Sequence, residues 1–225
     1  MKLQWLGHSC FVLTESTGTA IVADPYGHVG YDMPEVAAHA VTVSHNHHDH
    51  NNVGAVSGSP VVFDSPGIYD FRGVRITGIE SAHDGENGAA RGSNIIFKYR
   101  MDGLDICHLG DIGEDCTPAL IESIMPVDVL MIPVGGNYTL DAAQAKEYVD
   151  MLMPDIVLPM HYKTKSLNID IDRAEAFLRM FDDENVEILE TDTLMLDRDG
   201  ISSQTTKIWL LRRDKPSRKQ SNDAE

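Results

Sequence analysis

Four histidines and an aspartate lie within six consecutive residues, from His45 to His50. The apolar run 40–43 comes just before them and predicts a buried strand. Imidazoles and carboxylates are costly to bury without partners, and a divalent cation satisfies several of them at once. Side chains of His45 and His47 point the same way along an extended segment, and Asp49 follows on the next turn. A solvated loop or a purification tag is the alternative, but a tag lies at a terminus and lacks this spacing. We therefore predict a metal-binding loop.

Further candidate ligands follow predicted strands elsewhere in the chain: His83, Asp111 and His161. Loops that leave the same end of neighbouring strands converge, so we expect these side chains to meet the histidine loop. Taken one at a time, each fits an ordinary polar residue after a strand as well as it fits a ligand. We expect the remaining histidines to be non-ligands, with one packed in an apolar strand (His108) and three outside any motif or turned outward (His28, His39 and His48).

Two metal sites can be assembled from these residues. The first joins three neutral imidazoles and leaves one position open: His45, His47 and His83. The second joins a carboxylate to two imidazoles: Asp49, His50 and His161. Asp111 can bridge the two ions. These nitrogen and oxygen ligands suit zinc, with manganese, iron and nickel as alternatives.

The chemistry expected of such a centre is hydrolysis. Two carboxylates facing two divalent ions leave net positive charge, which favours a hydroxide bridged by the ions. Binding to a metal lowers the pKa of water from about 15.7 to about 7, so hydroxide is present at neutral pH. We expect it to attack a carbonyl carbon or a phosphorus atom, while Asp49 accepts or relays the proton.

The sequence allows two roles for each of two further residues near the expected centre, Asp24 and His8. Asp24 ends a predicted strand, and it either orients a ligand imidazole or forms the turn before Pro25. His8 either lines the cleft as a catalytic proton donor or is a hydrogen-bonded structural histidine.

Five residues beside the ligand loops are candidates for binding the substrate: Arg91, Asn137, Tyr138, Tyr162 and Lys163. The glycines before Asn137 precede a helix start, where free N–H groups favour an anion. The tyrosines carry hydroxyls, and Arg91, Lys163 and the nearby Lys165 are cations that can hold a carboxylate or phosphate. Surface cations and a plain glycine turn explain the same residues. The pattern favours a small anionic ester, lactone or phosphodiester.

The composition limits the class of protein. The 225 residues carry a net charge of −17, which disfavours a nucleic-acid partner and favours a small-molecule substrate. The sequence contains no run of 18 apolar residues, so we expect no membrane span. Three cysteines without metal-like spacing favour a reduced, cytoplasmic compartment. We expect one domain over residues 1–211 and a polar, disordered tail over 212–225. The sequence leaves the oligomeric state open, a homo-oligomer included.

The order of predicted elements indicates an α/β fold. Residues 1–109 are mostly strand-like, and the second half alternates helices with strands. We expect a helix from Pro118, a second one capped by Thr139 or Asp141, and a third over 172–181. Two sheets covered by helices on their outer faces form a four-layer αββα sandwich.

The ligand motifs resemble those of the metallo-β-lactamase superfamily. The loop Ser44-His45-Asn46-His47-His48-Asp49-His50 is similar to its T/S-H-x-H-x-D-H signature. The later motifs Ala82-His83-Asp84, Leu109-Gly110-Asp111 and Met160-His161-Tyr162 follow in the expected order. The resemblance implies an αββα fold, a dinuclear centre and hydrolase activity.

A finer resemblance is to the stand-alone, lactamase-like Zn-dependent hydrolases related to L-ascorbate-6-phosphate lactonase. It rests on four segments: Trp5-Leu6-Gly7-His8-Ser9, Asp24-Pro25-Tyr26, Pro133-Val134-Gly135-Gly136 and Pro159-Met160-His161-Tyr162. Only nine residues separate His50 from Pro60, so we expect the helix that usually follows the signature to be short or missing. The long insertion found in ribonuclease relatives is missing as well.

Three classes of function therefore stay open. The leading interpretation is a dinuclear metallohydrolase of small molecules. A metal-dependent nuclease or RNA-processing enzyme is the second, and the acidic composition opposes it. A non-catalytic metal-binding protein is the third, and the full set of ligands speaks against it.

Overall fold

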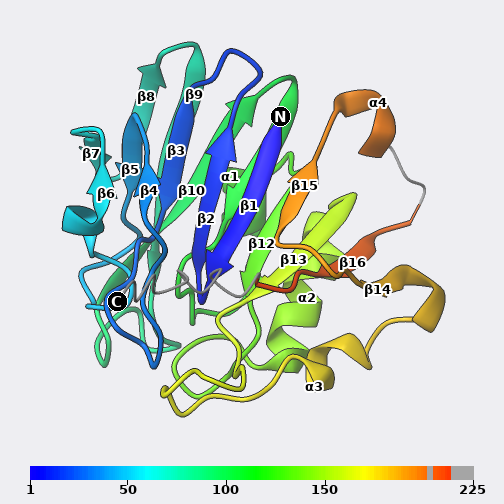
Figure 1. Cartoon of the computed structure of the whole chain (residues 1–225). Helices are drawn as coiled ribbons and strands as arrows, with labels where there is room; N and C mark the ends of the chain where they lie inside the picture. The colour runs from blue at the N-terminus through cyan, green and yellow to red at the C-terminus, as the bar shows by residue number, and fades with distance from the viewer. Residues whose placement is uncertain (202–204, 214–225) are drawn as a thin grey trace, which may run out of the picture.

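The chain is described by a computed structural model that covers residues 1–201 and 205–213. A six-stranded sheet has the order β15-β1-β2-β3-β5-β7 and lies in front of a second sheet in Figure 1. Its strands are β1 (Lys2–Gly7), β2 (Cys10–Thr14), β3 (Ala20–Ala23), β5 (Ala40–Thr42), β7 (Val61–Phe63) and β15 (Thr193–Met195). A separate short pair joins β4 (Val36–Ala37) to β6 (Val56–Ser57).

The second sheet has eight strands in the order β14-β16-β13-β12-β11-β10-β9-β8. Their bounds are β8 (Gly67–Phe71), β9 (Val74–Ala82), β10 (Ser93–Met101), β11 (Leu104–His108), β12 (Val129–Pro133), β13 (Ile156–Met160), β14 (Val186–Ile188) and β16 (Lys207–Leu210). Strands β8, β9, β10 and β11 each pair antiparallel with the next one along the chain, whereas β11, β12 and β13 are parallel. Both sheets are therefore mixed, and the fold is the expected α/β sandwich.

The helices are α1 (Pro118–Ile124), α2 (Ala142–Leu152), α3 (Glu175–Leu178) and α4 (Arg198–Ile201), with 3₁₀ turns η1 (Val53–Ala55) and η2 (Asp183–Asn185). Thr117 caps α1 by accepting a hydrogen bond from the N–H of Leu120. Asp141, and not Thr139, caps α2, with Gln144 completing a capping box. None of the helices in the described ranges is long and apolar enough to cross a membrane.

Side-chain alternation divides the first sheet between two cores. Phe11 and Leu13 of β2 face the second sheet, whereas Val12 belongs to a separate apolar cluster on the outer face. Within the described residues, that outer face is covered by loops and by the β4–β6 pair, through side chains such as Tyr26 and Leu167. Only η1 follows the histidine loop, so the helix expected to be short or missing there is a single 3₁₀ turn.

The third helix is shorter than the sequence predicts. It was expected over 172–181, but α3 covers only Glu175–Leu178. The backbone N–H of Asp172 donates to Gly135, and its carbonyl accepts from Lys163, so this residue is fixed by distant partners and does not start a helix.

The predicted tail begins inside the described part of the chain. Arg212 pairs with Glu190, and the guanidinium of Arg213 lies 3.8 Å from the ring of Tyr31. Residues 214–225 lie outside the described residues, so disorder in the tail stays a prediction.

Candidate metal centre

The carboxyl ends of six strands gather at one edge of the sandwich. In the first sheet β1, β3 and β5 run the same way, because β1 and β3 are both antiparallel to β2 and β5 is parallel to β3. In the second sheet β9 and β11 are both antiparallel to β10, and β12 links β11 to β13 in parallel. The residues that follow these ends include His8, Asp24, the loop 45–50, His83, Asp111 and His161. The topology thus brings the predicted site residues together.

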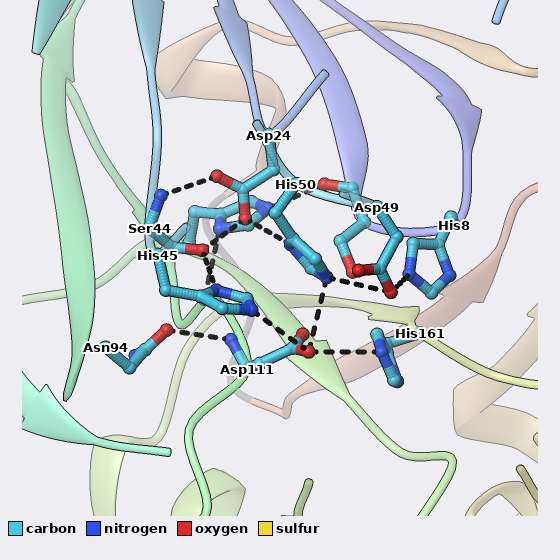
Figure 2. A network of polar contacts seen from close by, with 12 residues as sticks. His8, Asp24, Ser44, His45, Asp49, His50, Asn94, Asp111 and His161 are labelled. Carbon is cyan, nitrogen blue, oxygen red and sulfur yellow. Dashed lines mark hydrogen bonds and ion pairs between the residues drawn. The ribbon is translucent and has the colours of Figure 1, made fainter. Parts of the chain in front are cut away.

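Asp111 lies at the centre of this cluster. Its Oδ2 atom is 3.2 Å from Nε2 of His50 and 3.2 Å from Nε2 of His161. The same oxygen is 3.5 Å from Nε2 of His83 and 3.8 Å from Nε2 of His45. Figure 2 shows the carboxylate between the imidazoles of His45, His50 and His161. This is the position expected for a ligand shared by two ions.

The three histidines predicted for the first metal site lie close together in the structure. The potential ligand atoms of His45, His47 and His83 all lie within 4.8 Å of one another. Their rings pack edge to face, with centroids 4.6 Å apart for His45 and His47 and 4.6 Å apart for His45 and His83. His47 is the exposed member of the group and borders the pocket described below.

The group of residues predicted for the second metal site contains a fourth candidate ligand in the structure. Asp49, His50 and His161 come together as predicted, and His8 joins them, with all ligand atoms within 4.8 Å. Nε2 of His8 lies 3.2 Å from Oδ2 of Asp49, and its ring centroid is 4.4 Å from that of His161. The sequence left two roles open for His8, a proton donor in the cleft or a hydrogen-bonded structural histidine. In the structure His8 lies among the candidate ligands and contacts Asp49, the predicted proton acceptor.

Asp24 orients two imidazoles. Its Oδ2 accepts a hydrogen bond from Nδ1 of His50 at 2.8 Å and another from the hydroxyl of Ser44 at 2.6 Å. That hydroxyl in turn accepts from Nδ1 of His45 at 2.9 Å. Both rings are thereby held in the tautomer that leaves Nε2 free to face the centre (Figure 2).

Three site residues have strained backbones. His8, Asp24 and His161 have φ angles of 52°, 47° and 48°, in the left-handed region that residues with a Cβ rarely adopt. Each comes directly after a strand end, and the left-handed residue turns the chain sharply there. Such strain persists where the surrounding structure holds the residue in place, and it is common at functional sites.

Electrostatics prepare the centre for a cation. Burial lowers the pKa of His45 to about 3 and that of His8 to about 4, with neighbouring histidines acting in the same direction. Burial also opposes charge on His50 and Asp111. The carboxylates of Asp111 and Asp24 nevertheless raise the pKa of His50 well above its ordinary value, and His161 and His50 hold the pKa of Asp111 well below its own. The ionised carboxylate of Asp111 and the neutral imidazoles of His45 and His8 are the forms that bind metals, whereas His50 must release its proton when an ion binds.

The donor set fits a metal ion. Nε2 of His45, Nε2 of His50 and Oδ1 of Asp111 are buried and have no hydrogen-bond partner among the described residues. Buried polar atoms without partners are rare and call for an explanation, such as an ion. A cation between these atoms would satisfy all three.

A pocket of about 260 Å³ opens onto the centre, and the ligands His47, His83, Asp111 and His161 line it. Arg91 and Tyr138, two of the predicted substrate-binding residues, also line it. The guanidinium of Arg91 lies 4.4 Å from the centroid of the Tyr138 ring.

The other three substrate-binding assignments need correction, because these side chains do not line this pocket. Tyr162 is buried and stacks on Trp5, with centroids 5.7 Å apart. Nζ of Lys163 donates to the carbonyl of Ile169, and the amide of Asn137 donates to the carbonyl of Asp170. The polar groups of Lys163 and Asn137 are thus engaged by backbone carbonyls and do not face the centre.

The four histidines predicted as non-ligands lie outside the three groups of candidate ligands in the described chain. His108 is packed, with Nε2 donating to Ser9 and Nδ1 accepting from Gly110. His28 pairs with Asp32 on the surface, and Nδ1 of His39 accepts from Ala20. His48 is 75% exposed in its side chain and lies at the rim of the pocket.

Sequence reasoning missed three supporting residues. Ser44 links His45 to Asp24, Asn94 accepts the backbone N–H of Asp111, and Asp84 accepts the backbone N–H of Arg91. A polar amide directly before the apolar run 95–97 of β10 was a signal for Asn94. Ser44 and Asp84 adjoin predicted ligands, but their partners depend on the fold.

A sandwich of two mixed sheets with a histidine and aspartate cluster at the strand ends has the metallo-β-lactamase fold. The β-lactamase superfamily domain matches residues 2–161. A UPF0173 protein of Pyrococcus furiosus is 32% identical over 185 residues, which cover 74% of this chain and 85% of that protein. A UPF0173 metal-dependent hydrolase of Thermoplasma volcanium is 30% identical over 191 residues, covering 73% and 84% of the two chains.

Among solved structures, one from Thermotoga maritima is assigned to the Zn-dependent hydrolases of the metallo-β-lactamase superfamily. It matches with a TM-score of 0.77 and 37% identity, over 94% of this chain and 99% of that one. The chain therefore belongs to the UPF0173 metal-dependent hydrolase family of the metallo-β-lactamase superfamily.

Proposed function

We propose that this chain is a metal-dependent, dinuclear hydrolase that cleaves a small anionic ester, lactone or phosphodiester in the cytoplasm. One observation carries the proposal: a buried carboxylate, that of Asp111, lies within 3.8 Å of four imidazole nitrogens beside a pocket that also contains Arg91. The hydrolase names of the relatives support the same class of reaction.

Two groups of side chains would hold the ions. His45, His47 and His83 form one group; Asp49, His50, His161 and the added His8 form the other. Asp111 is placed to serve both. When bound, divalent ions supply hydroxide at neutral pH and positive charge at the bond that breaks. We propose zinc, with manganese, iron or nickel as alternatives for this donor set.

Asp49 is suited to accept a proton. Its carboxylate is only 13% exposed, and burial alone would raise its pKa. The hydrogen bond from His8 and the charge of His50 nevertheless hold that pKa below the ordinary value, so the group is ionised at neutral pH. An ionised carboxylate on the pocket wall can take a proton from an attacking water, and His8 lies at hydrogen-bond distance to orient it.

Arg91 is suited to hold an anionic substrate group. Asp84 accepts hydrogen bonds from four backbone N–H groups of the loop 86–91, including that of Arg91. This arrangement orders the loop, and the contact with Tyr138 positions the guanidinium at the pocket. A planar guanidinium matches carboxylate and phosphate oxygens in a way that a lysine does not.

A lactone substrate and a nucleic-acid substrate are not equally well supported by the sequence. Resemblance to the lactonase subgroup makes a lactone a natural member of a substrate panel. The net charge of −17 speaks against a nucleic-acid substrate, because phosphate neutralisation requires clustered cations over a long groove.

The test is a panel of p-nitrophenyl ester, lactone, thioester and bis-p-nitrophenyl phosphate substrates with the metal-loaded chain. We expect hydrolysis of at least one class, and a KM at least about tenfold higher for anionic members in Arg91→Ala. Arg75→Ala is the matched control, because Arg75 forms an exposed ion pair with Asp70 away from the pocket. No turnover of any class, or equal effects of the two variants, would contradict the proposal.

A further inference from the structure

A second pocket concentrates positive charge on this acidic chain. It has a volume of about 630 Å³, within the usual range for small-molecule sites. Four cations line it, and none of its lining residues is an aspartate or glutamate: Lys165, Arg173, Arg212 and Arg213. Because the whole chain carries −17, such a grouping runs against the average composition. The lining of this pocket therefore favours an anion, in contrast to the acidic composition of the whole chain.

The four cations of this pocket differ in whether they already form an ion pair. Within the described residues Lys165 and Arg173 have no ion pair, and both are exposed. Arg212 is paired with Glu190 at 2.7 Å. Lys165 and Arg173 are thus available to an incoming anion without breaking a contact in the described chain.

Arg213 is built into the wall of the pocket. Its guanidinium lies 3.8 Å from the ring centroid of Tyr31, and Nη1 is 3.4 Å from the hydroxyl of Tyr26. A Cβ at Gly7 would lie 3.1 Å from Cδ of Arg213, so the side chain packs directly against this glycine. A guanidinium fixed over an aromatic ring is pre-organised to hold an anion.

Apart from the cations and the hydroxyl side chains of Thr164 and Ser166, the pocket lining is aromatic and apolar. Tyr162 and Trp5 line it and stack at an interplanar angle of 25°, and Leu210 borders it. Flat aromatic side chains offer contact area to a flat apolar group at low entropic cost. Positive charge on one wall and aromatic surface on another are complementary to a ligand that combines an anionic group with a flat apolar group.

This pocket is distinct from the metal pocket, since no residue lines both. The two are neighbours along the chain: His161 lines the metal pocket and Tyr162 lines this one. The indole N–H of Trp5 also donates to the carbonyl of His8 at 2.9 Å.

From these observations we propose that residues 162, 164–166, 173 and 210–213, with Trp5 and Tyr31, form a second binding site for a small organic anion, one with a phosphate or carboxylate beside a flat apolar body. The proposal does not depend on hydrolysis, because it concerns binding alone.

Phenylphosphonate is a suitable probe, since it combines both features and has no ester bond to cleave. The chain has two tryptophans, Trp5 and Trp209, so Trp209→Phe leaves Trp5 as a reporter inside the pocket. We expect saturable quenching or enhancement of its fluorescence in the metal-loaded protein. Methylphosphonate and benzyl alcohol, which each carry one of the two features, should bind at least about tenfold more weakly.

Matched double variants separate this site from general charge effects and from the metal pocket. In the Trp209→Phe background, Lys165→Ala with Arg173→Ala should raise the Kd at least about tenfold. Arg75→Ala with Lys98→Ala removes two exposed cations elsewhere and should leave the Kd within about twofold. Equal weakening by both pairs, or no Trp5 response, would overturn the proposal. Weakening by Arg91→Ala alone would also overturn it, by assigning the probe to the metal pocket.

Discussion

Nδ1 of His50 donates a hydrogen bond of 2.8 Å to the buried carboxylate of Asp24. The same carboxylate accepts from the hydroxyl of Ser44, which accepts from His45. One residue outside the candidate ligand groups therefore fixes one imidazole in each half of the centre. The sequence left two roles open for Asp24, and the geometry supports the orienting role.

Replacing Asp24 with asparagine is expected to lower metal affinity by about 10–100-fold, because supporting hydrogen bonds of this kind set the orientation and basicity of ligand imidazoles. Competition with a chromophoric chelator measures the change. Asp32→Asn is the matched control, since Asp32 forms a 2.8 Å pair with His28 on the surface, away from the centre. Equal affinities in the two variants would show that Asp24 has no part in metal binding.

The sequence predicted candidate site residues best where a histidine or aspartate directly follows a clear apolar strand. The histidine loop, His83, Asp111 and His161 follow strands whose apolar runs are clear, and parallel strand direction then brings their carboxyl ends to one edge.

The errors lie in irregular segments, where no periodicity fixes the direction of a side chain. Tyr162 and Lys163 follow a ligand directly, yet one stacks on Trp5 and the other donates to Ile169. The helix predicted over 172–181 was shortened by backbone hydrogen bonds to residues far away in the sequence. The contact of His8 with Asp49 joins residues 41 positions apart and depends on the fold.

Asp111→Asn is expected to reduce metal content from two ions per chain to one or none. An amide lacks the negative charge that offsets the charge of two cations, and it is a weaker metal ligand than a carboxylate. Metal analysis after gel filtration gives the stoichiometry. Asp105→Asn serves as the control, because Asp105 lies on β11, the strand that precedes Asp111, and pairs with Arg100 outside the candidate ligand groups. Two ions retained in Asp111→Asn would refute the bridging role.

Gly110→Ala is expected to lower the free energy of unfolding by about 2–4 kcal/mol, since overpacking and left-handed strain add together. Gly110 has a φ of 60°, and a Cβ there would overlap Oδ1 of Asn94 and lie 2.7 Å from Cβ of Ser44. Both neighbours support ligand residues, so metal content should fall as well. Urea unfolding measures the loss. Gly54→Ala is the control, because a Cβ at Gly54 meets nothing within 4 Å; similar losses in both variants would contradict the steric explanation.

The three cysteines are expected to react slowly with alkylating reagents at pH 8 in the folded protein. Burial raises the pKa of Cys107 to about 12 and that of Cys116 to about 11, and it raises the pKa of Cys10 well above the ordinary value. Only the thiolate reacts, so a pKa of 12 leaves about one reactive molecule in 10,000 at pH 8. Reactivity should increase as the pH rises, and the upward shift moves that increase to a higher pH than for an exposed thiol. Mass spectrometry should find at most slow labelling of Cys116 in the native state and three modified thiols per chain in urea. Rapid labelling of Cys10 or Cys107 under native conditions would mean that the two buried strands that carry them open far more readily than their packing implies.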